Sequence, residues 1–336
     1  MAPRYVRPSH SDLIHPPIRL PHIWRANFFI RQPSVLWIVC LCFLGVMSVF
    51  WTPSPARAEA TLSSSASLQR TVPAWAPQPS PFRTFRRSRI PAESILLKDI
   101  STGRILYAYE ADRRVSPASL TKIMSALVML EHGRLDDPVT VSREAAAARK
   151  MHLRLRAGHI FRLDDLVKAM LITSANDACL AAAIHVGGSE DKFVDLMNAK
   201  ARALGLLHTH FSNACGFDSP THYTTAQDLV SLTELALQHP LFRSYVKEER
   251  GILTAVNTNR SYLLRTTNRL FSRMSGVEGV KTGFTSKAGR CLIAKVSQDG
   301  KELLLVLLHA SSRWNTAAHL IKYGLNNPSV TTSALH

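Results

Sequence analysis

The spacing of apolar residues divides the chain into an early strand pair, a run of helices and a late group of strands. The apolar stretches at 95–99 and 105–109 flank the polar turn Ser101-Thr102-Gly103, and this pattern predicts a β-hairpin. After Pro117 the apolar side chains recur every three or four residues. This period predicts a helix that begins near Ser119 and ends at Gly133.

The middle of the chain continues with helical spacing. Helices are predicted at 164–172, 175–186, 190–204 and 225–238. Thr225 and Asp228 form a capping-box pattern at the start of the last of these, and Pro240 is expected to stop it. Acids at helix starts are favourable, so we interpret Asp164-Asp165 as a helix beginning rather than a catalytic carboxylate pair.

Strand patterns return near the carboxyl end of the chain. Strands are predicted at 279–282, 291–297 and 302–309, followed by a helix at 314–323 that Gly324 caps. The last two strands flank Asp299-Gly300, which indicates a tight hairpin. The whole order predicts an α/β fold in which one antiparallel sheet takes strands from both ends of the domain, with a helical subdomain between them.

The first 58 residues have the pattern of an export signal. Five arginines and one aspartate lie among residues 1–33, and an uncharged apolar run of 17 residues follows from Val35 to Trp51. Ala56-Arg57-Ala58 then supplies small residues on both sides of a cleavage site, so we expect cleavage after Ala58. An uncleaved membrane anchor is the alternative, although this run is at the short end for a spanning helix. Both interpretations export the remainder to the periplasm or cell envelope.

Composition divides the rest of the chain into a linker, one domain and a tail. Residues 59–91 are rich in Pro, Ser and Arg and predict a basic extended linker, 92–326 predict the folded domain, and 327–336 a short tail. Residues 1–58 account for +5 of the net charge of +17, which leaves +12 on residues 59–336. This excess favours an anionic wall polymer or membrane surface as a partner of the basic segment, or serves solubility alone. No pattern indicates nucleic acid.

Three cysteines follow the export segment. Cys179, Cys215 and Cys291 include no CxxC pair. One disulfide and one free thiol are compatible with an oxidising compartment. We favour the alternative that all three are small buried apolar residues, and none is predicted to be a nucleophile.

Three short motifs carry the chemistry of the domain: SLTK at 119–122, SAN at 174–176 and KTG at 281–283. Ser119 and Lys122 are three positions apart at a helix start, so they share a face with their Cβ atoms about 5–6 Å apart. A lysine whose pKa is lowered by burial or by nearby cations removes a serine proton. SxxK also occurs at 189–192 and 244–247, where we interpret it as a helix-surface pair. The three motifs in this order predict a serine acyl-transfer site that needs no histidine.

The motifs and their surroundings resemble the low-molecular-mass penicillin-binding proteins, specifically the D-alanyl-D-alanine carboxypeptidase family, serine peptidase family S11. The resemblance spans residues 92–326 and includes PASLTKIM at 117–124, TSANDA at 173–178, YTTAQDL at 223–229 and GVEGVKTGFT at 276–285. It implies the transpeptidase fold shared by penicillin-binding proteins and β-lactamases. It also implies removal of the terminal D-alanine from peptidoglycan stem peptides, with no cofactor or metal.

The resemblance also implies a role for each motif residue. The catalytic residues would be Ser119 as the nucleophile, Lys122 as its base and Ser174 as a proton relay. The substrate-binding residues would be Asn176 at the substrate amide, Lys281 and Thr282 at the terminal carboxylate, Gly283 at the strand backbone, and Phe284, whose N–H would complete the oxyanion hole with that of Ser119. Penicillins would acylate the same serine.

The sequence departs from the family pattern in three respects. Phe284 stands where many relatives have histidine, but a backbone N–H is the implied donor, so the oxyanion hole is expected to survive. Arg269 is our candidate for the arginine that helps bind the carboxylate in relatives. Many relatives continue into a second β-rich domain and a membrane helix. Few residues follow Gly324 here, so membrane attachment is expected only at the amino terminus.

Three other functions compete with the carboxypeptidase. A D,D-endopeptidase would use the same site on crosslinks, although Asn176-Asp177-Ala178 favours the carboxypeptidase group. A β-lactamase lacks an evident acid for fast deacylation, and a non-catalytic wall-binding protein would not need the intact motifs. His208, His210 and His222 lack further ligands at zinc spacing, so we interpret them as packing or surface residues.

Overall fold

A computed structural model describes residues 90–327 of the chain. The export signal expected at 1–58, nearly all of the linker expected at 59–91 and the tail after 327 lie outside the described residues. Within 90–327, none of the helices combines the length and the apolar character that crossing a membrane requires.

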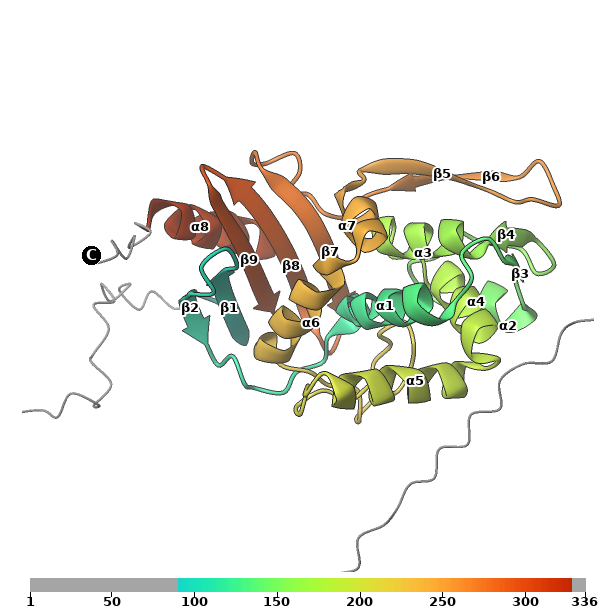
Figure 1. Cartoon of the computed structure of the whole chain (residues 1–336), viewed down its shortest axis with the longest axis horizontal. Helices are drawn as coiled ribbons and strands as arrows, with labels where there is room; N and C mark the ends of the chain where they lie inside the picture. The colour runs from blue at the N-terminus through green and yellow to red at the C-terminus, as the bar shows by residue number, and fades with distance from the viewer. Residues whose placement is uncertain (1–89, 328–336) are drawn as a thin grey trace, which may run out of the picture. The chain divides into compact units, whose positions relative to one another are not determined.

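A five-stranded antiparallel sheet forms one part of the domain (Figure 1). Its strands are β1 (Ser94–Asp99), β2 (Ile105–Tyr109), β7 (Val277–Thr285), β8 (Gly289–Gln298) and β9 (Lys301–Leu308). They lie in the order β2-β1-β9-β8-β7, so β1 pairs with β9 although about two hundred positions separate them in the chain. This order confirms the prediction that one sheet takes strands from both ends of the domain.

Both faces of the sheet are covered. Helix α8 (Arg313–Asn326) packs on one face, and α6 (Ala226–Gln238) and the turn before α1 (Lys122–His132) pack on the other. Because each face has its own apolar layer, β9 is buried without interruption over 303–308 and does not alternate with polar residues.

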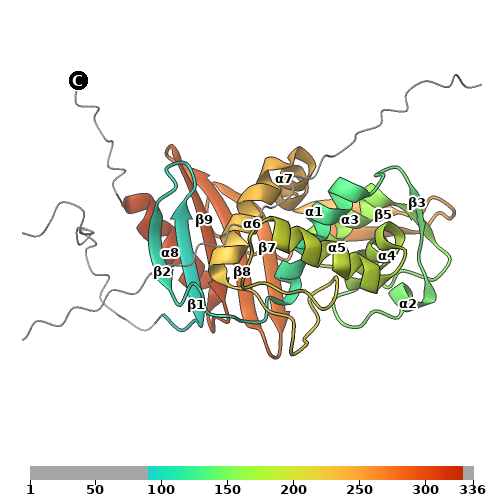
Figure 2. The same cartoon turned by 60° about the horizontal axis from the view of Figure 1, so that its bottom comes forward.

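The remaining helices gather beyond the β7 edge of the sheet, as Figure 2 shows. They are α2 (Arg143–Ala146), α3 (Leu163–Ile172), α4 (Asn176–Gly187), α5 (Glu190–Ala203) and α7 (Pro240–Lys247). Two small strand pairs accompany them: β3 (Pro138–Thr140) with β4 (Ile160–Arg162), and β5 (Arg250–Thr254) with β6 (Ser261–Arg265). The predicted helical subdomain is thus present, next to the edge strand that carries the KTG motif.

Local chemistry explains where the elements begin and end. Thr225 caps α6, because its hydroxyl accepts the N–H of Asp228 at 3.0 Å. Pro240 was expected to stop this helix; it also begins α7, since proline suits the first helical position. Gly324 was expected as a cap, but it lies inside α8, where an added Cβ would come within 2.8 Å of Leu303.

The cysteine interpretation needs a correction. Cys179 on α4 and Cys215 in the loop after α5 form a disulfide, whereas Cys291 is a free, buried thiol on β8. The favoured prediction of three buried thiols was therefore wrong for the first two residues. Both are almost fully buried, so burial and oxidation coincide here, and sequence spacing alone does not separate them.

Candidate active site

The SLTK motif forms a tight turn at the start of α1. Ala118–Thr121 is a 3-10 turn, and α1 begins at Lys122, one turn later than the sequence pattern predicts. The hydroxyl of Thr121 bonds with the carbonyl of Ala118 and the ring of buried His222, both at 2.8 Å. These contacts fix the backbone around Ser119 and give His222 a packing role.

Lys122 points its amine at Ser119 from a fully buried position. Its Nζ donates to Ser119 Oγ at 3.3 Å, to Asn176 Oδ1 at 2.7 Å and to the Cys215 carbonyl at 2.5 Å. Burial holds the pKa of Lys122 well below its usual 10.5. The charge of Lys281 adds to this effect, and that of Asp177 opposes it. The amine is thus in contact with the hydroxyl and biased towards its neutral, proton-accepting form.

The loop after α5 supports both Ser119 and Lys122. The Asn213 side-chain oxygen accepts the N–H groups of Cys215, Gly216 and Phe217, which closes the loop tightly. Gly216 has a φ of +87°, and an added Cβ would lie 2.0 Å from the Ala118 carbonyl oxygen. A glycine is therefore required where this loop meets the serine turn.

The SAN motif follows α3 and enters α4. Ser174 is buried and has a φ of +63°, an uncommon backbone conformation that often accompanies function. The Asn176 amide contacts Lys122 through its oxygen and donates to the Arg149 carbonyl at 3.0 Å through its nitrogen. Asp177 is fully buried and accepts the N–H groups of Leu153 and Leu155. Asp177 thus secures the segment between β3 and β4 against the site.

The KTG motif lies on edge strand β7, and its lysine reaches the SAN motif. Lys281 Nζ donates to Ser174 Oγ at 2.9 Å and to the Thr282 carbonyl at 3.1 Å. Burial, with a contribution from Arg313, lowers the pKa of Lys281 to about 7. Thr282 bonds through its hydroxyl to that of Thr267 at 2.5 Å. The second and third motifs therefore meet through a lysine–serine contact that mirrors the first.

Gly283 and Phe284 complete the strand beside the nucleophile turn. A Cβ at Gly283 would lie 3.0 Å from the Pro117 carbonyl oxygen and 3.1 Å from the Ala118 Cβ, so the absence of a side chain allows β7 to approach. Phe284 is 60% exposed, and its ring lies 6.0 Å from the Arg290 guanidinium. Its side chain thus forms part of the rim.

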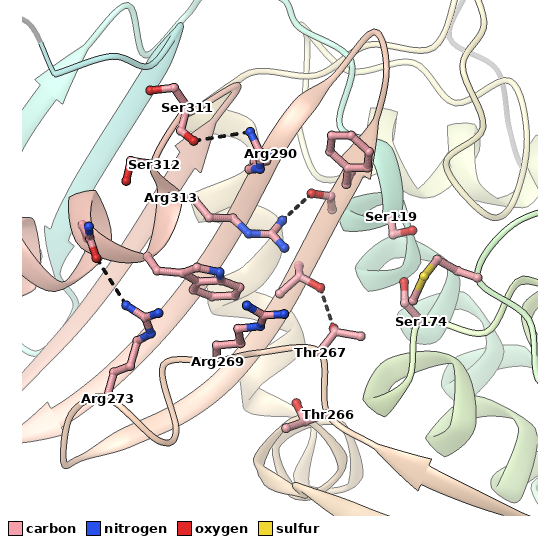
Figure 3. Close-up of a pocket in the computed structure, with 16 residues that line it drawn as sticks. Ser119, Ser174, Thr266, Thr267, Arg269, Arg273, Arg290, Ser311, Ser312 and Arg313 are labelled. Atoms are coloured by element: carbon pink, nitrogen blue, oxygen red, sulfur yellow. Dashed lines mark hydrogen bonds between the residues drawn. The ribbon is translucent and has the colours of Figure 1, made fainter.

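An open cavity of about 850 Å³ joins these elements (Figure 3). Ser119 and Ser174 lie at one end of it. Thr282, Gly283 and Phe284 also line it. Of the nine site residues predicted from the sequence, the structure lines this cavity with six: Ser119, Ser174, Thr282, Gly283, Phe284 and Arg269. Lys122, Asn176 and Lys281 lie directly behind it, hydrogen-bonded to one another or to its serines.

Arg313 is a site residue that the motifs did not reveal. Its guanidinium donates to the Gly283 carbonyl at 2.7 Å and to the Cys291 carbonyl at 3.0 Å, and it stacks 4.5 Å from the Trp314 ring. It begins α8, thirty residues after the KTG motif, so only the sheet topology brings it to β7. No local pattern in the sequence indicated it.

The arrangement suits acyl transfer. A hydroxyl in contact with a buried amine gives a nucleophile and its base, and a second buried lysine with Arg313 gives a cationic wall for a carboxylate. No residue among those that line the cavity is acidic.

Comparison with known proteins agrees with this geometry. The family model described as D-alanyl-D-alanine carboxypeptidase matches residues 81–312. D-alanyl-D-alanine carboxypeptidase DacF of Bacillus subtilis is 33% identical over 69% of this chain and 60% of its own length. A D-alanyl-D-alanine endopeptidase of Pseudomonas aeruginosa is 32% identical over 66% of this chain and 72% of its own.

A solved structure supports the same relationship. A mutant of the Streptomyces K15 DD-transpeptidase superposes with a TM-score of 0.66 at 30% identity, covering 70% of this chain and 98% of that one. The aligned part of this chain spans about three fifths of the length of the first carboxypeptidase relatives. The family model covers more than half of the chain, and the fold is that of the penicillin-binding proteins. The chain belongs to the D-alanyl-D-alanine carboxypeptidase family of serine peptidases.

Proposed function

We propose that this protein is a serine-type D-Ala-D-Ala carboxypeptidase that removes the terminal D-alanine from peptidoglycan stem peptides through an acyl-enzyme on Ser119. The observation that carries the proposal is the 3.3 Å contact between Ser119 Oγ and the fully buried amine of Lys122. Burial lowers the pKa of this amine and so favours the neutral form, which is what a serine nucleophile needs at hydrogen-bond distance.

The reaction begins with transfer of the Ser119 proton to Lys122 as Oγ bonds to the carbonyl carbon of the penultimate D-alanine. The N–H groups of Ser119 and Phe284 stabilise the oxyanion of the tetrahedral intermediate. The C–N bond then breaks, and a proton passes by way of Ser174 to the leaving nitrogen. Water attacks the ester, and the shortened peptide leaves with a new carboxylate while Ser119 regains its proton.

Binding of the substrate uses the cationic side of β7. Lys281, Thr282 and Arg313 present a positive, hydrogen-bonding surface to the terminal carboxylate, and Arg269 lies along the same cavity. Asn176 aligns the substrate amide from the opposite side. Penicillins carry a carboxylate at a comparable distance from a reactive carbonyl, so we expect them to acylate Ser119 as well.

The site of action follows from the substrate. Peptidoglycan lies outside the cytoplasmic membrane, and the export pattern at 1–58 agrees with a function in the periplasm or cell envelope. The basic segment before the domain is suited to contact with an anionic wall or membrane surface.

A D,D-endopeptidase is the second candidate, and the size of the cavity is compatible with it. A volume of about 850 Å³ exceeds what a leaving D-alanine occupies and is large enough for part of a second peptide strand. A non-catalytic wall-binding protein would not require a buried lysine in contact with the serine.

The test offers two substrates to protein beginning at Glu59, with Ser119→Ala as the control and products identified by mass. Release of one alanine from a stem pentapeptide, absent in the control, is the expected result. Cleavage of a crosslinked dimer alone would favour the endopeptidase. Turnover of neither substrate would contradict an enzymatic function and support wall binding.

A further inference from the structure

The cavity carries more positive charge than one carboxylate can neutralise. Four arginines line it: Arg269, Arg273, Arg290 and Arg313. No Asp or Glu lies on its wall, and none of the four makes an ion pair with any residue in 90–327. Burial lowers the pKa of Arg313; Cys291 opposes this effect, and the charges of Arg290 and Arg269 add to it.

The four guanidinium groups differ in how they are held. Arg313 is bound to the carbonyls of Gly283 and Cys291, and Arg290 to the carbonyl of Ser311 at 3.4 Å. Arg273 donates to the Asn315 side chain at 3.2 Å. The side chain of Arg269 makes no hydrogen bond or ion pair with the described part of the chain, and the buried Nε of Arg313 also has no partner.

Arg269 and Arg273 lie on the side of the cavity that is farther from the nucleophile. Figure 3 shows Arg269 and Arg273 across β7 from Ser119 and Ser174, on the segment that follows β6. The ring of Trp314 also lines the cavity and provides an apolar surface for an aliphatic chain. A ligand that fits both ends of the cavity therefore carries two carboxylates. One lies near the nucleophile, and the other lies near Arg269 and Arg273, joined to the first by an apolar stem.

We infer that Arg269 and Arg273 form a second anion subsite, which selects a leaving group that bears a further carboxylate beyond the one at the scissile position. This inference rests on the proposed function, because it assigns the cavity to the leaving side of the scissile bond. A leaving amino acid with an acidic side chain belongs to this class. A crosslinked leaving peptide also belongs to it when the attached strand ends in a free carboxylate.

The test uses a matched pair of leaving groups. Diacetyl-L-Lys-D-Ala-D-Glu and diacetyl-L-Lys-D-Ala-D-Gln have nearly the same shape and differ in one charge. Charged hydrogen bonds are stronger than neutral ones, so kcat/KM is expected to favour D-Glu by about fivefold at low salt. The double variant R269Q/R273Q is expected to bring this ratio to about one. Arg202→Gln, an exposed arginine on α5, keeps the wild-type ratio.

A binding measurement separates this inference from the proposed function. Calorimetry with the Ser119→Ala protein gives the affinities of the two peptides without turnover. Tighter binding of D-Glu, lost in R269Q/R273Q, supports the subsite even where no peptide is hydrolysed. Hydrolysis of diacetyl-L-Lys-D-Ala-D-Ala with a D-Glu to D-Gln ratio of one would overturn the subsite and leave the carboxypeptidase standing.

Discussion

Lys122 owes its proposed function to burial more than to its place in a motif. The exposed SxxK pair of Ser189 and Lys192 has the same spacing, but there the serine accepts the Lys192 backbone N–H as a helix cap. Lys122 instead lies at 0% exposure and contacts only neutral oxygens. Solvent exclusion thus lowers the pKa of the Lys122 amine and favours its proton-accepting form.

Replacement of this base by a permanent cation tests the assignment. Arginine stays protonated, so Lys122→Arg is expected to slow acylation by a fluorescent penicillin by about 10³-fold, within the range for loss of a general base. The measurement is the second-order rate of covalent labelling. Lys192→Arg is the matched control and should label at the wild-type rate. A Lys122→Arg rate within tenfold of wild type would contradict the role of Lys122 as the base.

The two buried lysines predict a bell-shaped pH profile. Acylation needs Lys122 neutral, so kcat/KM for a D-Ala-D-Ala peptide rises with pH through its lowered pKa. Attraction of the carboxylate needs Lys281 protonated, so kcat/KM falls above its pKa of about 7. Lys281→Arg keeps the charge and is expected to move the falling limb to above about pH 10.

Two outcomes of the pH measurement would contradict the proposed role of Lys281. If kcat/KM of the wild-type protein keeps rising to pH 10, the charge on Lys281 is not needed for the substrate. A falling limb that Lys281→Arg leaves unmoved would assign that limb to another group. Lys192→Arg serves here too, since an exposed lysine should not alter either limb.

The residues of the site differ in how far sequence predicts them. The motif residues are predictable because the chemistry demands particular side chains at fixed short spacing. Arg313 is not predictable in this way, because strands β8 and β9 separate it from Gly283 in the chain and only the folded sheet brings the two residues together. The structural roles of Asn213 and Asp177, which bind backbone N–H groups, likewise depend on tertiary contacts.

The turn that carries Ser119, Ala118–Thr121, and the loop after α5 pack so closely that the contact leaves no room for a side chain at Gly216. Gly216 and Gly103 both have positive φ values, +87° and +75°, so alanine is strained at either position by about 1 kcal/mol. Only at Gly216 does the added Cβ meet backbone, the Ala118 carbonyl. The turn that holds Ser119 must then move.

Gly216→Ala is therefore expected to affect the reaction more than the fold. A shift of about 1 Å at the nucleophile costs on the order of 10²-fold, so penicillin labelling should slow by about that factor. Gly103→Ala, with open space at its Cβ, should lower Tm slightly and label normally. Equal labelling rates in the two variants would contradict the proposed steric role of Gly216.

Elements were predictable where one apolar period dominates. The strands β1, β8 and β9 and the helices α3 to α6 were anticipated because each buries one or two faces. Strand β2 was anticipated because it follows the polar turn Ser101-Thr102-Gly103. The hairpin of β5 and β6 was not, since only Leu253, Tyr262 and Leu264 of it are buried while Ile252 and Leu263 are exposed. Apolar residues of this hairpin stand at exposed as well as buried positions, so the sequence does not show a clear alternation of apolar and polar residues.

At the scale of the whole domain, the site joins two structural parts. Ser119, Lys122 and Ser174 come from the helical part, whereas Lys281 and Thr282 come from the sheet. Neither part holds both the proposed nucleophile and the proposed carboxylate-binding wall. Packing between them, through apolar residues of α1, α6, α7 and β7, therefore controls the geometry of the reaction.

The disulfide restrains the helical part and is expected to matter for both stability and rate. Cys179 and Cys215 close a loop with a sequence separation of 36, which includes most of α4 and all of α5. Chain-entropy arguments assign such a loop about 2–4 kcal/mol of stability. The Cys215 carbonyl also accepts from Lys122, so release of the loop is expected to disturb the base.

Reduction of the wild-type protein should therefore lower Tm by about 5–15 °C for a domain of this size and slow penicillin labelling. C179A/C215A should match the reduced protein and no longer respond to reductant. Cys291→Ala, which removes a buried thiol outside the crosslink, should keep the full response to reductant. If Cys179 and Cys215 of the unfolded, non-reduced protein both react with an alkylating reagent, the crosslink is absent. The prediction of three buried thiols would then apply after all.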